Sequence, residues 1–208
     1  MSEEMFNIAM ERMSEIGWSG PVDYNFYNEP TADKRLTDLV KQTKRKLPRS
    51  LPRVVTNGDY LTERLTQDLI DAGVVNFSIS RHYPESQAWD KKIASLQTKF
   101  GKYITLHKIW PRSDLSNRGG TVEIKDYKPI DTCDAPAVTL NILYNGDVIL
   151  CCCDYKRKYV FGNISKQGLL EIWKNEEFQK QRQLVRDGQP EFDICKACFG
   201  KAEPSSQV

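Results

Sequence analysis

The sequence predicts an α/β protein that consists of a parallel β-sheet region followed by a smaller α+β region with a β-hairpin and a helix. Short strands alternate with helices over roughly the first 110 residues, which is typical of βαβ units. After that, two alternating apolar segments flank Asn145-Gly146, a strong hairpin signal. All six cysteines follow residue 130, so the second region carries its own chemistry.

The first region should contain helices ended by glycines and strands between them. The first helix begins at Ser2, a residue able to cap it, and ends at Gly17. The remaining expected elements are a strand at 22–27, a helix at 33–46, a short strand at 54–55, a helix at 61–72 ended by Gly73, a strand at 74–80, a helix with Trp89, Ile93, Leu96 and Phe100 on one face, and a strand at 103–109.

The second region should open with an irregular polar stretch at 111–120. A strand at 137–144, a two-residue Asn145-Gly146 turn and a strand at 148–152 then form the hairpin. One helix follows, with Leu169, Ile172, Trp173, Phe178 and Leu184 as its apolar residues. Residues 201–208 are expected to be a disordered tail.

Composition narrows the class of protein. The chain has 208 residues, a formal net charge of +2 and 39% hydrophobic residues, as expected for an ordinary globular protein. Its longest apolar run, around Ile149 and Leu150, is too short to span a bilayer, so we expect no membrane partner. The balanced charge argues against nucleic acid, and we interpret the basic stretch from Lys41 to Arg53 as a solvated helix end.

Polar and turn residues recur where three of the expected parallel strands end. They are Asn28-Glu29-Pro30, Thr56-Asn57-Gly58 and Ser78-Ile79-Ser80-Arg81. Ligands of open α/β sheets gather at the carboxyl ends of the strands. Each segment alone is explained by a turn or a surface charge. Taken together, the three segments support a ligand-binding role and a purely structural role about equally.

The cysteine spacing predicts a metal centre. Twelve residues separate Cys133 from Gly146, four residues separate that glycine from Cys151, and Cys195-Lys-Ala-Cys198 closes the set. Thiolates hold iron–sulfur clusters and zinc. A structural Zn²⁺ therefore remains an alternative, and so do buried core cysteines. Three adjacent cysteines make an awkward disulfide framework and no signal peptide precedes the chain, so we expect a reducing, cytoplasmic location.

Taken together, these segments resemble a known family. The cysteine pattern, the strand-end segments with Glu29, and Gly162-Asn163-Ile164 followed by Leu170-Glu171-Ile172-Trp173 are similar to radical S-adenosylmethionine proteins with a C-terminal SPASM or twitch domain. The resemblance covers nearly the whole chain.

The resemblance implies a fold, a division into domains and a ligand set. Residues 1–120 would form an incomplete partial (β/α) barrel of parallel strands, and residues 121–200 a SPASM/twitch-like domain. That domain would hold an auxiliary [4Fe–4S] cluster on Cys133, Cys151, Cys195 and Cys198. The Gly146-x4-Cys spacing favours Cys151 among the three adjacent cysteines, which leaves Cys152 or Cys153 as a packed neighbour or a spare thiol.

The chain departs from the family in one respect. Family enzymes hold the catalytic cluster with Cys-x3-Cys-x2-Cys after the first barrel strand, yet residues 1–132 contain no cysteine. Met1 stands where the helix after that loop would begin, so we expect the first strand and its cluster loop to be absent. A fragment or misassigned start codon, an N-terminal partner polypeptide, or a noncatalytic relative would each account for this.

The resemblance also implies cofactor contacts and a reaction. Glu29 would accept from the methionyl ammonium of S-adenosylmethionine, Ser78 or Ser80 would reach its ribose, and Arg118 would pair with its carboxylate. Family enzymes cleave this cofactor to a radical that abstracts a hydrogen from a small-molecule or peptide substrate, and the auxiliary cluster accepts an electron or shapes the pocket. A noncatalytic remnant or a zinc-binding module is the alternative function.

Overall fold

A computed structural model describes residues 1–81, 86–108 and 116–202 of the 208-residue chain. The chain divides into two compact units. One consists of Met13–Asp114 and is called here the parallel-sheet unit. The other combines Met1–Arg12 with Leu115–Val208 and is called the C-terminal unit. The first twelve residues thus join the C-terminal unit, whereas the sequence suggested a division near residue 120.

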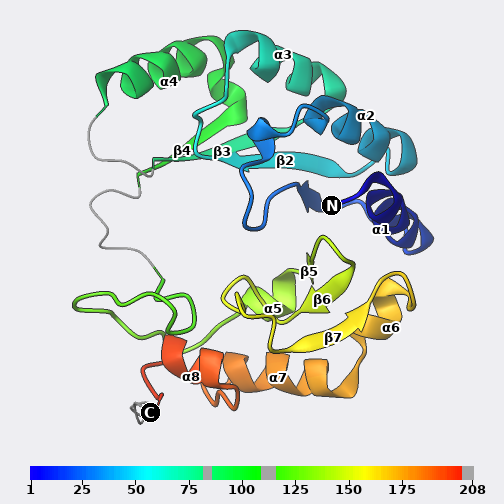
Figure 1. Cartoon of the computed structure of the whole chain (residues 1–208), viewed down its shortest axis with the longest axis vertical. Coiled ribbons are helices and arrows are strands. Elements are labelled where there is room, and N and C mark those ends of the chain that lie inside the picture. The colour runs from blue at the N-terminus through cyan, green and yellow to red at the C-terminus, as the bar shows by residue number, and fades with distance from the viewer. Residues whose placement is uncertain (82–85, 109–115, 203–208) are drawn as a thin grey trace. The chain divides into compact units, whose positions relative to one another are not determined.

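The elements are shown in Figure 1. In chain order they are α1 (Glu3–Glu15), β1 (Pro21–Asp23), the 3-10 helix η1 (Pro30–Ala32), α2 (Leu36–Lys46), β2 (Leu51–Thr56), α3 (Glu63–Ala72), β3 (Asn76–Arg81), α4 (Gln87–Phe100), the 3-10 helix η2 (Gly101–Tyr103), β4 (Ile104–Lys108), α5 (Ala135–Val138), β5 (Asn141–Ile142), β6 (Asp147–Ile149), β7 (Val160–Asn163), α6 (Leu169–Trp173), α7 (Glu176–Arg186) and α8 (Asp193–Cys198).

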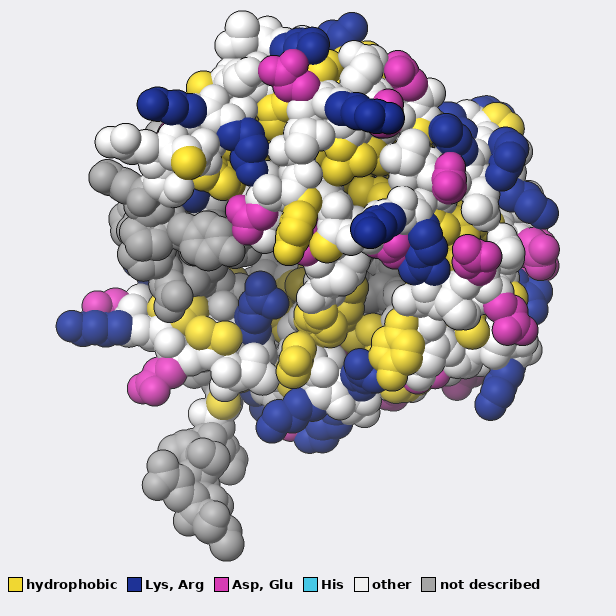
Figure 2. Space-filling view, turned by 45° about the horizontal axis from the view of Figure 1, so that its top comes forward, with side chains coloured by type: hydrophobic (Ala, Val, Ile, Leu, Met, Phe, Trp, Pro, Cys, Tyr) yellow, Lys and Arg dark blue, Asp and Glu magenta, His cyan; other side chains and the backbone are white. Residues whose placement is uncertain are grey.

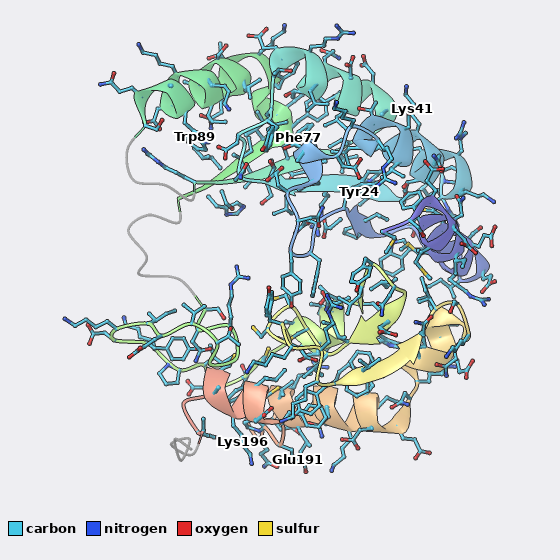
Figure 3. All side chains as sticks on the ribbon, in the orientation of Figure 1. Tyr24, Lys41, Phe77, Trp89, Glu191 and Lys196 are labelled. Carbon is cyan, nitrogen blue, oxygen red and sulfur yellow. The ribbon has the colours of Figure 1, made fainter. Side chains whose placement is uncertain are left out.

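Four parallel strands in the order β1-β2-β3-β4 build the parallel-sheet unit. Helices α2, α3 and α4 lie along one face of this sheet (Figure 1). Phe77 and Ile79 of β3 are fully buried, and Trp89 of α4 is 8% exposed. Figure 3 shows the Phe77 and Trp89 labels on the helix-covered side of the sheet. The predicted parallel α/β architecture of this region is confirmed.

The helices predicted in this unit are present, although α2 begins at Leu36 instead of residue 33 and α3 at Glu63 instead of residue 61. Thr62 caps α3 by accepting from the Leu65 N–H at 3.1 Å, and Ser86 caps α4 through the Trp89 N–H. Gly73 ends α3 with a left-handed φ of +115°, a conformation that favours glycine. The chain can then turn back into β3.

The sheet has a second, polar face because strand residues alternate in direction. Asn76, Ser78 and Ser80 alternate with the buried Phe77 and Ile79 along β3. The Asn76 amide donates to Thr105 of β4 at 3.0 Å. On the neighbouring strands, Arg53 forms an ion pair with Asp23 at 2.6 Å.

The prediction of a strand over residues 22–27 was too long, since β1 ends at Asp23. The Asn28 side chain closes a turn here: its Oδ1 accepts from the Phe26 N–H at 3.0 Å and its amide donates to the Tyr24 carbonyl. Local bonds between an asparagine side chain and the backbone compete with strand pairing. The strand predicted at 54–55 is longer than expected and covers Leu51–Thr56.

The C-terminal unit contains the antiparallel sheet β5-β6-β7 and helices α6 and α7. Its core includes Phe178, which is fully buried and stacks on Phe161 with ring centroids 4.2 Å apart. Residues of α1 pack on the same unit, since Arg12 Nε donates to the Ile164 carbonyl at 3.0 Å. The Ser2 cap of α1 is also present, with the Met5 N–H donating to its hydroxyl at 3.1 Å.

Several sequence predictions for the C-terminal unit were wrong in detail. Residues 135–138 form a short helix rather than the start of a strand, because Pro136 lies in its first turn, where proline is favoured. The single helix predicted at 169–184 is two helices, since Asn175 caps α7 through the Phe178 N–H. Strand β7 was not predicted. The expected tail at 203–208 lies outside the described residues.

Within the described ranges, no helix combines the length and the apolar composition that crossing a membrane requires. Figure 2 shows positive and negative side chains interspersed over the visible face, with hydrophobic side chains between them.

Candidate iron–sulfur cluster site

The hairpin of β5 and β6 places the three adjacent cysteines at one end of the antiparallel sheet. Its turn contains three residues, Tyr144, Asn145 and Gly146, because the Leu143 N–H donates to the Asp147 carbonyl and the Gly146 N–H to the Leu143 carbonyl. Gly146 adopts φ +87°, as expected for a hairpin turn with a bulge. The predicted two-residue Asn-Gly turn was therefore one residue too short, although the hairpin itself is confirmed.

A buried aspartate holds the chain that follows these cysteines. Asp154 is fully buried, and its two carboxylate oxygens accept from the N–H groups of Lys158 and Tyr159, each at 2.8 Å. The Asp154 N–H donates to the Cys151 carbonyl at 3.1 Å, which closes a turn over Cys151 to Asp154. The sequence prediction did not include this residue, because an aspartate directly after a short strand is also common in exposed turns.

Helix α8 carries the Cys-x-x-Cys pair. Cys195 is buried and Cys198 is partly buried, and a spacing of three places both on one side of a helix. The Asp193 carboxylate accepts from the Tyr159 hydroxyl at 2.6 Å and forms an ion pair with Lys158. The Tyr159 and Phe192 rings stack at 3.7 Å. Residues just beyond the Asp154 turn are thereby joined to the start of α8.

Backbone hydrogen bonds to α7 and α8 position Cys133 and the segment before it. Its N–H donates to the Val185 carbonyl of α7 at 3.0 Å, and the nearby Ile130 N–H donates to the Cys198 carbonyl at 3.2 Å. The Tyr127 hydroxyl donates to the same Cys198 carbonyl at 2.8 Å. The segment before Cys133 therefore lies against the end of α8.

The loop after residue 115 packs on the same helix. The Asn117 amide donates to the Ala197 carbonyl at 2.9 Å, and its oxygen accepts from the Cys198 thiol at 3.5 Å. A Cβ on Gly119 would lie 3.0 Å from Ile194 and 3.2 Å from the Cys153 carbonyl, so a side chain there would crowd the site. None of these contacts was predicted from the sequence.

The thiols of all three cysteine-bearing segments interact with one another. Burial raises the pKa of Cys133, with a further contribution from Cys153. Burial also raises the pKa of Cys195 to about 12, and Cys133 and Cys153 add to this effect. Cys151 and Cys198 each bond to Cys153, which raises their pKa values and lowers that of Cys153.

This donor set fits an iron–sulfur cluster. Soft sulfur ligands lie in one unit, partly or fully buried, and the Cys153 N–H donates to the Cys151 sulfur at 3.4 Å. Among residues 1–81, 86–108 and 116–202, no group of three or more His, Cys, Asp or Glu side chains is arranged to hold a metal ion. A single metal ion requires all of its ligand atoms within bonding distance of one point. A [4Fe–4S] cubane instead binds one thiolate at each of its four irons. The individual ligand assignments remain predictions.

The residues predicted to bind S-adenosylmethionine occur in both units. Glu29 lies at the end of the parallel sheet, where one oxygen accepts from the Thr31 N–H at 3.0 Å and from the Thr56 hydroxyl at 2.6 Å, and the other accepts from the Asn57 N–H at 2.8 Å. The carboxylate thus joins two of the strand-end segments. An ionised carboxylate has about four acceptor positions, so its second oxygen can still accept from a ligand.

Ser78 and Ser80 lie on β3, on the polar face of the sheet opposite Phe77. Arg118 belongs to the C-terminal unit, has φ +48°, and its charge acts on Cys152. The structure therefore brings Arg118 to the cysteines of its own unit. The predicted cofactor contacts of all four residues, Glu29 included, remain predictions.

Comparisons with known proteins were made with both the sequence and the structure. A family model described as the SPASM iron–sulfur cluster-binding domain matches residues 133–199. The S-adenosyl-L-methionine-dependent 2-deoxy-scyllo-inosamine dehydrogenase of Niallia circulans is 30% identical over 206 residues, which cover 95% of this chain and 80% of the relative.

Two solved structures are also similar. The crystal structure of BtrN in complex with AdoMet and 2-DOIA matches with a TM-score of 0.85 and 28% identity, over 94% of this chain and 79% of that one. Native anSMEcpe with bound AdoMet matches with a TM-score of 0.56 and 13% identity, over 99% of this chain and 83% of that one, and shows a shared fold. The chain therefore belongs to the radical S-adenosylmethionine family and carries a C-terminal SPASM iron–sulfur cluster-binding domain.

Proposed function

We propose that the chain holds an auxiliary [4Fe–4S] cluster in its C-terminal unit and binds S-adenosylmethionine through its parallel-sheet unit. Cys133, Cys195, Cys198 and one cysteine of the 151–153 run are the proposed ligands. The observation that carries this proposal is the meeting of thiols from three separate segments within the domain that matches the SPASM family. When bound, such a cluster supplies a one-electron acceptor.

The reaction class follows from the 30%-identical dehydrogenase, whose name describes oxidation of a cyclic amino alcohol. We propose that this chain takes part in the oxidation of a hydroxyl-bearing carbon in a cyclic polyol or amino polyol. Hydrogen abstraction from that carbon, followed by loss of one proton and one electron, gives the ketone. Glu29, Ser78, Ser80 and Arg118 are the proposed cofactor contacts.

The radical-forming cluster needs three thiolates that these 208 residues do not contain in the required spacing, because the first cysteine is Cys133. We propose that a polypeptide segment with Cys-x3-Cys-x2-Cys supplies them, either as an N-terminal partner or as further sequence. Stable thiolates in such sites also favour a reducing, cytoplasmic location.

Binding of S-adenosylmethionine to the anaerobically reconstituted chain tests the cofactor proposal. Calorimetry should detect saturable binding, and Glu29→Gln should weaken it at least tenfold because the ammonium loses its carboxylate partner. Asp68→Asn, which changes an exposed carboxylate of α3, serves as the control. Equal affinity for the wild-type chain and Glu29→Gln would remove Glu29 from the cofactor site.

A second candidate function is binding of S-adenosylmethionine without turnover. The cysteine-free stretch from residue 1 to 132 favours it. Formation of 5′-deoxyadenosine after addition of a polypeptide with Cys-x3-Cys-x2-Cys would exclude this candidate, whereas binding without any 5′-deoxyadenosine would support it.

A further inference from the structure

We propose that the 151–153 run offers two interchangeable ligands to the auxiliary cluster, so that Cys153 as well as Cys151 can complete the site. This inference rests on the proposed function, in which Cys133, Cys195 and Cys198 supply the other three thiolates. The family spacing selects Cys151 alone, so a role for Cys153 comes from the geometry of this chain.

Cys153 is the thiol that meets the other segments. Its sulfur lies 3.7 Å from the Ser116 hydroxyl, and the next residue, Asn117, accepts from the Cys198 thiol at 3.5 Å, so Cys153 and Cys198 contact adjacent residues of one loop. Cys153 also interacts electrostatically with Cys133 and with Cys195. The Cys153 sulfur therefore lies near the thiols of both other cysteine-bearing segments, the one with Cys133 and the one with Cys195 and Cys198.

The backbone turn explains how Cys153 reaches this position. The bond from the Asp154 N–H to the Cys151 carbonyl bends the run back on itself, and the Cys153 N–H then lies 3.4 Å from the Cys151 sulfur. The Ser116 hydroxyl lies 3.7 Å from the Cys153 sulfur on its other side. The buried Asp154 keeps this turn closed.

Cys151 and Cys152 differ from Cys153 in their surroundings. Cys151 is 8% exposed and follows β6 directly, and its strongest interactions are with Cys153 and Cys152. Cys152 is exposed, which suits a surface residue of the turn rather than a buried ligand. Two of the three thiols are thus placed to bind iron.

Replacement of one ligand by the other is a simple exchange. When the Cys151 sulfur is missing, the Cys153 thiol gives its proton to solvent and its sulfur bonds to the vacant iron. No electron is transferred, so no oxidant or reductant is needed. A nearby thiolate can occupy the position at the cost of a side-chain rotation.

Three double variants test this inference, each of which leaves one thiol in the run. Cys152→Ser/Cys153→Ser keeps Cys151, Cys151→Ser/Cys152→Ser keeps Cys153, and Cys151→Ser/Cys153→Ser keeps Cys152. After anaerobic reconstitution, iron and sulfide per chain should match wild type in the first two variants and fall at least tenfold in the third. Electron paramagnetic resonance of the reduced protein should differ between the first two, since the fourth ligand differs.

Wild-type protein separates failure of this inference from failure of the proposed function. If the wild-type chain retains a cluster but the Cys153-only variant loses as much iron as the Cys152-only variant, Cys153 is not a ligand and the inference is wrong. Loss of iron from the Cys151-only variant would equally overturn the interchange. A wild-type chain without iron after reconstitution would overturn the proposed function itself. Far-ultraviolet circular dichroism checks that each variant is folded.

Discussion

The two units of this chain differ in how they hold their functional groups. In the C-terminal unit, the candidate ligands come from three segments far apart in sequence, and a buried aspartate, helix α8 and the loop around Asn117 keep them together. In the parallel-sheet unit, the candidate contacts lie at strand ends, where Glu29 already bonds to Thr31, Thr56 and Asn57. Protein contacts therefore hold both sites, but the first site joins segments far apart in the chain, whereas the second joins the loop after β1 to the end of β2.

The largest expected effect comes from removing a cluster ligand. Cys198→Ser should lower the iron content at least tenfold and destabilise the C-terminal unit, because cluster binding is coupled to folding. Cys152→Ser, a change at an exposed neighbour, should leave the iron content unchanged. Iron analysis and thermal unfolding measure both effects. Normal iron content in Cys198→Ser would remove that residue from the site.

Large-to-small substitutions in the two hydrophobic cores should affect the stability of one unit each and should differ in their effect on iron retention. Phe178→Ala should destabilise the C-terminal unit by about 3–5 kcal/mol and reduce iron retention, since Phe178 is fully buried against Phe161. Phe77→Ala should destabilise the parallel-sheet unit by a similar amount and leave iron bound. Hydrogen exchange and iron analysis distinguish the two. Equal iron loss in both variants would show that the units do not unfold separately.

A smaller effect is expected at the strand ends. Glu29→Gln replaces the charged acceptor of four bonds, which should cost about 1–3 kcal/mol in the free energy of unfolding of the parallel-sheet unit. Iron content should not change. Chemical denaturation of Glu29→Gln and of the control Asp68→Asn measures the difference. If Glu29→Gln and the control had the same free energy of unfolding, these bonds would make no net contribution to stability.

Surface ion pairs should give the smallest effect. The Lys180 side chain holds the pKa of Glu191 below its usual range in the C-terminal unit, and Lys99 does the same for Glu63 in the parallel-sheet unit. Figure 3 labels Glu191 at the surface. A lowered folded-state pKa contributes stability that is present above the unfolded value of about 4.3 and lost as pH falls through the folded value.

Glu191→Gln should therefore weaken the acid dependence of the C-terminal unit only, and Glu63→Gln that of the parallel-sheet unit only. The shift in Tm at pH 7 should be no more than a few degrees, since exposed pairs contribute little. Thermal unfolding between pH 3 and pH 7 checks this. An unchanged acid dependence in both variants would show that these pairs do not contribute.

Much of the fold could be predicted because its signals are local. Caps such as Thr62 and Gly73, and the alternation of Phe77 and Ile79 with Ser78 and Ser80, follow from neighbouring residues. The predicted parallel sheet and hairpin were confirmed for the same reason. The split into α6 and α7 depends on one Asn175 side chain, and the end of β1 on one Asn28, and both residues were overlooked.

The candidate cluster site was only partly predictable. Cysteine spacing identified the segments that supply sulfur, because few residues other than cysteine perform that chemistry. The supporting contacts of Asn117 and Gly119 with α8 join residues far apart in sequence. No local pattern records such pairs, so only the folded structure reveals them.

Thiols of the C-terminal unit are expected to hold an iron–sulfur cluster. Mössbauer spectroscopy and metal analysis of the anaerobically purified wild-type chain measure its presence. Iron and sulfide should occur in the proportions of one cubane per chain. One zinc ion per chain, with no iron or sulfide before or after reconstitution, would contradict this expectation.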